Sequence, residues 1–214
     1  DEAFSLALAT GHSLEHPARD ARAELGDFVE GEGAEPAAAW RRSMEHAGLG
    51  LAGVWRAVRL SDTNPPLYYL LLHLWARVLG TSDRALRGLS VLASLAAYPF
   101  IARLARRVGG RAAVCPACVL YAFAPVSVYY STEGRMYSLL WLASAALAES
   151  TLALRTGRSK AMALAGWIAW SLVGLWTHYF FAFAWCAFVG WLVLWPRRAS
   201  RAHVLGAAAI AAVL

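Results

Sequence analysis

Long apolar segments separated by short arginine clusters fill the second half of the chain. Because a bilayer core is about 30 Å thick and needs about 20 apolar residues per helix, this pattern predicts five membrane-spanning helices and the start of a sixth near residue 202. The five predicted spans are residues 88–105, 112–130, 136–154, 161–177 and 179–196. Residues 161–195 would form one helix of about 52 Å at 1.5 Å per residue, which is too long to cross once, so we expect a turn at residues 177–179.

Three prolines, Pro99, Pro116 and Pro125, lie within these predicted spans. A proline removes one backbone hydrogen bond and kinks a helix. In a membrane the neighbouring helices can absorb the kink that such a proline causes, so we keep the three prolines within the predicted spans.

The first 87 residues have a different pattern, with polar and glycine-rich sequence between short apolar runs. Residues 40–47 and 51–60 predict short helices. Residues 65–75 are apolar for only about eleven residues, which favours a helix lying in the membrane interface over one that crosses. We therefore predict an all-α, polytopic transmembrane helical bundle, in which a large external loop with interfacial helices (residues 1–87) precedes the transmembrane region (residues 88–214).

The composition supports a membrane protein over a soluble one. Hydrophobic residues make up 59% of the chain and charged residues 16%, whereas a soluble domain is about 25% charged. The basic pI is explained by loop charge, and no nucleic-acid-binding motif occurs. Since the chain begins with Asp1 in place of Met and ends within an apolar run, we expect it to be a fragment of a longer polypeptide.

The distribution of charge predicts which side of the membrane each loop faces. Residues 1–87 carry a net charge of −3, and residues 88–214 carry +9. Ten positive charges cluster at residues 103–111, 155–160 and 197–201. Loops rich in Lys and Arg face the cytoplasm, so the helix ends at residues 131–137 and 177–179, together with the first loop, should face the opposite compartment.

The most informative polar pair on that side is Glu133 and Arg135, at the junction of two apolar helices. A guanidinium can bind a phosphate through two parallel hydrogen bonds, and a nearby carboxylate can orient it or a sugar hydroxyl. The alternative is a local ion pair between these two residues that closes a turn. The sequence alone leaves both interpretations open.

Each other candidate on this side also has a structural alternative. Asp1 and Glu2 could supply a general base or hold a cation, or could be the solvated end of a helix. His178 could bind a phosphate or a metal, or be a hydrogen-bonded structural residue. Asp62 and Asn64 precede two prolines and fit helix caps or turn formers as well as substrate ligands.

Two further groups are assigned structural roles. Glu149 lies within a predicted span on its cytoplasmic half, where it needs a buried partner or a proton. Cys115 and Cys118 are spaced like a metal-binding pair, but a zinc site would require further ligands that the sequence does not place nearby. We expect both cysteines to be packing residues.

Four motifs in order resemble bacterial glycosyltransferase family 39 and its protein O-mannosyltransferase-like relatives. They are residues 1–5 (DEAFS), 62–75 (DTNPPLYYLLLHLW), 129–137 (YYSTEGRMY) and 177–180 (THYF). Together they extend over nearly the whole chain, and all lie on the side opposite the arginine clusters. The family usually has His-Pro-Pro where this chain has Asn64-Pro65-Pro66.

The resemblance implies a C-type (GT-C-like) glycosyltransferase in a bacterial inner or plasma membrane, with its active site outside the cytoplasm. Such an enzyme transfers a hexose or pentose, with inversion, from a polyprenyl-phosphate donor to a hydroxyl of a protein, glycolipid or cell-wall glycan. By the resemblance Asp1 is the base, Glu2 supports it, and Arg135 stabilises the phosphate leaving group. The implied substrate-binding residues are Asp62, Asn64, Glu133, Arg135, Tyr137 and His178.

Two questions stay open at this level. A divalent cation is a conceivable cofactor, but the sequence shows no ligand set for it. The competing function is a polytopic transporter or flippase of a lipid-linked or anionic substrate. Transporters often contain paired repeats with broken helices near the midplane, and we find no such internal repeat in this sequence.

Overall fold

The structure is a computed structural model that describes residues 2–14, 27, 33, 36, 38, 41, 50–156 and 159–194. Every regular element in these residues is a helix, which confirms the all-α prediction. The chain divides into a first unit, Asp1–Ser90 with Thr132–Arg135, and a second unit, Val91–Ser131 with Met136–Leu214. Asp1, most of the helix predicted at residues 40–47 and the sixth span from residue 202 lie outside the described residues.

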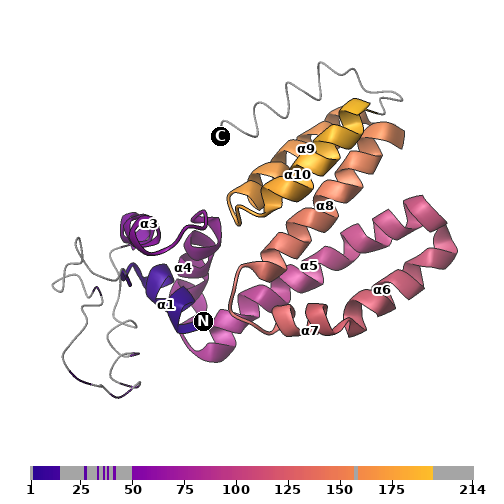
Figure 1. The fold of residues 1–214 in the computed structure, drawn as a ribbon. Coiled ribbons are helices and arrows are strands. Elements are labelled where there is room, and N and C mark those ends of the chain that lie inside the picture. Colours follow the sequence, from indigo (N-terminus) through magenta and orange to yellow (C-terminus); the bar gives the residue numbers. More distant parts are fainter. Residues whose placement is uncertain are drawn as a thin grey trace. The chain divides into compact units, whose positions relative to one another are not determined.

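The first unit contains three short helices that pack on one another. They are α1 (Glu2–Thr10), α3 (Gly50–Ser61) and α4 (Leu67–Leu79) (Figure 1). Leu8, Val54 and Leu72, one from each helix, are fully buried between them. A polar contact joins two of the helices, since His73 Nδ1 donates a hydrogen bond to the carbonyl of Ala9 at 2.8 Å.

Gly11 lets α1 end against α3. It has a left-handed φ of +89°, and the amide of the next residue, His12, donates to the carbonyl of Ala7 at 2.9 Å. A Cβ at residue 11 would lie 3.2 Å from the backbone carbonyl carbon of Gly53. Glycine therefore permits both the reversal of the chain and the close approach of α3.

The boundary between α4 and α5 (Asp83–Gly109) follows from local chemistry. Gly80 ends α4 with a φ of +83°, and the hydroxyl of Ser82 accepts the N–H of Ala85 at 3.3 Å, as an N-cap does. The indole of Trp75 then donates to the carbonyl of Ala85 at 2.7 Å. With 13 residues, α4 is shorter than the roughly 20 residues of a crossing helix.

The second unit contains the rest of α5 and the apolar helices that follow it. These are the short helix η2 (Arg111–Ala113), α6 (Val114–Phe123), α7 (Pro125–Ser131), α8 (Tyr137–Thr156), α9 (Lys160–Leu175) and α10 (Phe181–Leu194). Among the described residues, two helices, α5 and α8, are long and apolar enough to cross a membrane. The bent pair formed by residues 111–123 and 125–131 makes a third if it acts as one span. All five predicted spans coincide with apolar helices, and that all five cross stays a prediction.

The span predicted at residues 112–130 is not a single helix. It bends by 60° between α6 and α7, at Ala124, whose backbone is extended (ψ 123°). The residue before a proline avoids the helical conformation because the proline ring clashes with it, and Pro125 follows directly. A kink within this span is what the proline predicts, and that the bent pair crosses the membrane as one span stays a prediction. At Pro99, in contrast, α5 continues as one helix.

Helices α8, α9 and α10 run side by side and form a hydrophobic core in the second unit (Figure 1). Trp167 is 1% exposed at its centre, and its indole donates to the hydroxyl of Thr151 at 3.0 Å. The chain turns between Leu175 and Phe181, which confirms the turn predicted at residues 177–179. The ring of Phe181 lies against Gly174, where a Cβ would overlap it.

Glu149 is buried and pairs with an arginine of α5 that stays partly exposed to solvent. Its Oε1 lies 2.9 Å from Nε and from Nη2 of Arg107, and 4.0 Å from Nε of Arg103. The predicted span ends at residue 105 and leaves Arg107 in the loop that follows. Because α5 continues to Gly109, Arg107 is instead helical and faces α8.

Candidate functional site

The turn that carries Glu133 and Arg135 is anchored in the first unit. The N–H of Gly134 donates to Oε1 of Glu2 at 3.0 Å, and the hydroxyl of Ser90 donates to the carbonyl of Arg135 at 3.1 Å. Within the turn, the N–H of Arg135 donates to the carbonyl of Glu133 at 2.8 Å. The predicted turn therefore exists, and α1 and α5 hold it in place.

Glu2 is the main anchor of this turn, and its charge is held by Arg87. Arg87 donates from Nε to Oε1 of Glu2 at 2.7 Å and from Nη2 to Oε2 at 2.8 Å, the parallel geometry that is strongest for such pairs. The Arg87 guanidinium and the Gly134 N–H lower the pKa of the Glu2 carboxyl against a smaller effect of burial. Glu2 is therefore ionised at neutral pH and suits a positioning residue better than a base.

Glu133 presents an acceptor atom that the described residues do not satisfy. The residue is half-buried, and its Oε2 atom is fully buried with no hydrogen-bond partner among them. A buried carboxylate oxygen without a donor is destabilising. Such an atom is suited to accept a hydrogen bond from a ligand hydroxyl.

Arg135 is half-buried, among aromatic side chains of the first unit. Its guanidinium carbon lies 5.9 Å from the ring centre of Phe4, within the range of a cation–π contact. Tyr68 is also near, and burial raises the pKa of its phenol well above the ordinary range although the positive charge of Arg135 opposes that shift. The phenol therefore stays protonated and can donate a hydrogen bond.

Asp62 and Asn64 form a turn before α4. The carboxylate of Asp62 accepts the backbone N–H of Asn64 at 3.0 Å, its side-chain amide at 2.9 Å and the hydroxyl of Tyr69 at 2.5 Å. Burial and this carboxylate together raise the pKa of Tyr69. These are the contacts of a turn former, and a role of either residue in substrate binding stays a prediction.

The remaining two candidates, Tyr137 and His178, are neighbours in the second unit, with ring centres 6.2 Å apart. His178 is 5% exposed and stacks on Phe180 with ring centres 5.3 Å apart and an interplanar angle of 16°. Its Nδ1 accepts the N–H of Phe180 at 3.2 Å, so in the neutral ring the proton is on Nε2. These contacts agree with a hydrogen-bonded structural histidine.

Two residues of α5 that hold the turn, Arg87 and Ser90, were not predicted from the sequence. From the sequence, Arg87 counted only as one of the charges of residues 1–87, and Ser90 was not a candidate for any role. Both lie on the first turns of α5, three residues apart and therefore on one face of the helix. That spacing could have indicated that the two side chains act together, but it does not identify Glu2 as the partner of Arg87.

Metal chemistry finds no support in the part of the chain that the structure describes. No group of three or more His, Cys, Asp or Glu side chains there could hold an ion. Cys115, Cys118 and Cys186 are free thiols. Asp1 lies outside the described residues, and a cation bound with its help stays a prediction.

Comparisons with known proteins identify the family. Neither the curated proteins nor the solved structures give a match. The family model described as dolichyl-phosphate-mannose-protein mannosyltransferase matches residues 63–214, a range that includes Glu133, Arg135, Tyr137 and His178 but not Glu2. The chain therefore belongs to the dolichyl-phosphate-mannose-protein mannosyltransferase family, whose members are membrane glycosyltransferases with lipid-linked sugar donors.

Proposed function

We propose that this protein transfers a hexose or pentose from a polyprenyl-phosphate donor to a hydroxyl of an extracytoplasmic protein, glycolipid or cell-wall glycan, with inversion. The observation that carries the proposal is the anchored turn. A glutamate with a buried acceptor atom and an arginine are two residues apart on it, and Glu2 and Ser90 fix the backbone of the turn from two other helices. Fixed groups of opposite charge suit a donor that carries both a sugar and a phosphate.

In this proposal the turn binds the donor through both of its charged side chains. Oε2 of Glu133 accepts a hydrogen bond from a sugar hydroxyl, which would satisfy an atom that the described residues leave without a donor. The guanidinium of Arg135 binds the phosphate through two N–H groups. Negative charge grows on that phosphate as the sugar leaves, so Arg135 lowers the energy of the transition state more than that of the bound donor.

The transfer step is a single displacement at the anomeric carbon. The acceptor oxygen forms a bond to that carbon while the bond from the carbon to the phosphate oxygen breaks, and the polyprenyl phosphate leaves with the electron pair. Asp1 is proposed to take the proton of the acceptor hydroxyl. Glu2 is fixed by Arg87, and its role is to position the neighbouring Asp1 and the turn.

Transfer from a panel of radiolabelled polyprenyl-phosphate sugars tests the proposal, with membranes that contain the full-length protein. Arg135→Ala should lower turnover by about 100- to 1,000-fold, the usual effect of removing one group that stabilises a developing anion. The matched control is Arg84→Ala, because Arg84 is an exposed arginine of the same unit on the first turn of α5. Its turnover should equal that of the wild type.

Two results would contradict parts of this proposal. If Arg135→Ala retains full turnover at matched expression, Arg135 does not stabilise the leaving group. If Asp1→Asn retains full turnover, another residue is the base. A protein that transfers sugar from no donor in the panel would contradict the enzymatic function itself and favour the transport of a lipid-linked substrate.

The proposed orientation can be tested by cysteine labelling from outside the cell. Thr132 and Tyr179 are exposed near the predicted external ends, whereas Arg106 and Arg111 are exposed at a predicted cytoplasmic end. In a variant without the three native cysteines, an impermeant maleimide should reach a cysteine at positions 132 and 179 but not at 106 or 111. The reverse pattern would invert the topology.

A further inference from the structure

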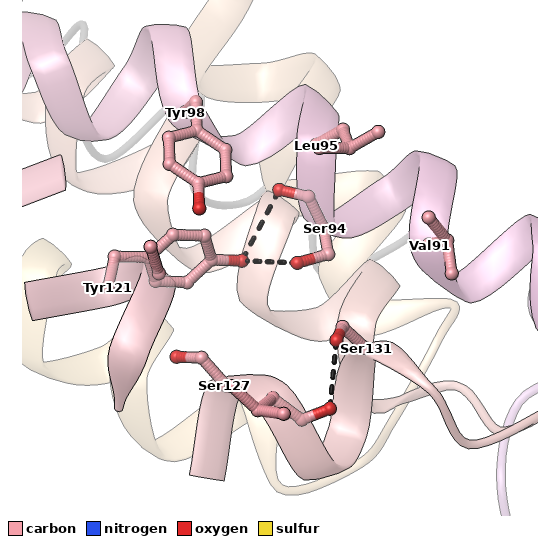
Figure 2. Close-up of a pocket in the computed structure, with 9 residues that line it drawn as sticks. Val91, Ser94, Leu95, Tyr98, Tyr121, Ser127 and Ser131 are labelled. Carbon is pink, nitrogen blue, oxygen red and sulfur yellow. Dashed lines mark hydrogen bonds between the residues drawn. The ribbon is translucent and has the colours of Figure 1, made fainter. Parts of the chain in front are cut away.

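A cavity of about 130 Å³ lies within the second unit, where α5 faces the bend between α6 and α7 (Figure 2). Hydroxyl-bearing side chains dominate its polar lining: they are Ser94, Tyr98, Tyr121, Ser127 and Ser131. No residue that lines it carries a charge. The cavity is larger than the roughly 30 Å³ that one water molecule occupies in the liquid. Its two walls, α5 and the pair α6–α7, belong to segments that are apolar enough to span a membrane.

Part of the polar lining is already paired. The hydroxyls of Ser94 and Tyr121 lie 3.0 Å apart, and the hydroxyl of Tyr121 also donates to the carbonyl of Ser94 at 3.3 Å (Figure 2). The rings of Tyr98 and Tyr121 meet edge to face with centres 5.0 Å apart. These contacts hold the wall formed by α5 and α6 in a fixed geometry.

Another part of the lining contains a polar atom that has no hydrogen-bond partner among the described residues. Ser127 is 8% exposed, and its Oγ is buried with no hydrogen-bond partner among the described residues. Figure 2 shows this side chain pointing from α7 toward Tyr121. In an apolar environment such a buried hydroxyl is destabilising unless a ligand satisfies it.

The rim of the cavity is apolar. Val91, Leu95 and Val128 line it and are 37%, 56% and 48% exposed. A ligand that enters past them meets apolar side chains first and hydroxyls inside. The chemistry therefore selects an uncharged amphiphile, because an anionic headgroup would find no cation in the lining.

We propose that this cavity binds the uncharged, hydroxyl-bearing end of a membrane lipid, such as the glycerol group of a diacylglycerol. The free hydroxyl of that lipid pairs with Oγ of Ser127, and its acyl chain lies along Leu95 and Val128. The inference does not depend on the proposed glycosyl transfer, since it concerns binding of a second lipid within the second unit.

Photo-crosslinking of the full-length protein in nanodiscs tests this proposal without any sugar donor. The probe is a diacylglycerol with a diazirine on one acyl chain, compared with a phosphatidylserine that carries the same chain. Mass spectrometry should place the diacylglycerol adducts within residues 91–131, at several times the yield of the phosphatidylserine. Ser127→Ala should lower that yield about fivefold, the effect of one lost neutral hydrogen bond.

Two further variants make the result decisive. Leu95→Trp narrows the rim at an exposed position that tolerates a larger side chain, and it should also abolish the preference for diacylglycerol. Ser144→Ala is the matched control, since this α8 hydroxyl bonds the carbonyl of Leu140 at 2.8 Å and does not line the cavity, and the yield should stay unchanged. Equal labelling by both lipids, no labelling, or labelling that both Ser127→Ala and Leu95→Trp leave intact would overturn the proposal.

Discussion

The ion pair between α5 and α8 makes the sharpest prediction about stability. Replacing Arg107 by Gln leaves the carboxylate of Glu149, whose side chain is 11% exposed, with only Arg103 at 4.0 Å. Removing one partner of a fully buried pair destabilises a protein by about 3–5 kcal/mol. Arg107 is 34% exposed, so solvent already screens part of the interaction, and we expect a loss of about 2–3 kcal/mol.

Equilibrium unfolding of the purified protein in detergent micelles measures this loss. The control is Arg106→Gln, an exposed arginine next to it on α5, which should change the free energy of unfolding by less than about 0.5 kcal/mol. Glu149→Gln should cost less than Arg107→Gln, because the amide oxygen of Gln still accepts from Arg107. The double variant should be less destabilised than the sum of the two single variants by at least about 1 kcal/mol.

The reasoning is refuted if Arg107→Gln behaves like Arg106→Gln. That result would mean that Arg107 is a solvated loop charge, as the arginine pattern by itself indicated, and that it does not pair with Glu149. A loss of stability without coupling in the double variant would instead mean that Arg107 packs against α8 without pairing with Glu149.

Three other perturbations test the packing and the anchored turn. Gly174→Ala should destabilise the second unit by about 1–3 kcal/mol, since a Cβ there overlaps the buried ring of Phe181; a transition midpoint in denaturant equal to that of the wild type would contradict this. Thr151→Val leaves the indole N–H of Trp167 without its acceptor and should cost about 1–3 kcal/mol, whereas Thr151→Ser should restore most of it in the same assay. The lowered pKa of Glu2 means that its ionised form stabilises the turn above the unfolded-state pKa of about 4.3, and that this contribution is lost as the pH falls through the lower folded-state value. Tryptophan fluorescence against pH should therefore show an acid transition that Glu2→Gln removes, and an identical transition in the variant would contradict the assignment.

The sequence by itself determined the positions of α8, α9 and α10 and the turn at residues 177–179. Both depend on local properties of the chain, namely the length of an apolar run and the residues at its ends. The family also follows from sequence, because motifs such as residues 129–137 are contiguous. Composition and loop charge likewise suffice to indicate a membrane protein, since neither depends on how the helices pack.

Only the tertiary structure decided which polar groups meet. Glu2 and Gly134 are 132 residues apart, and Arg107 and Glu149 are 42 apart, so the sequence pattern offers no reason to pair them. Such contacts depend on how far one helix is rotated and shifted against the next, which the packing of all side chains sets together. The bend at Pro125 has the same origin, because a proline weakens a helix locally while the surrounding helices determine whether it bends by 60° or continues, as α5 does at Pro99.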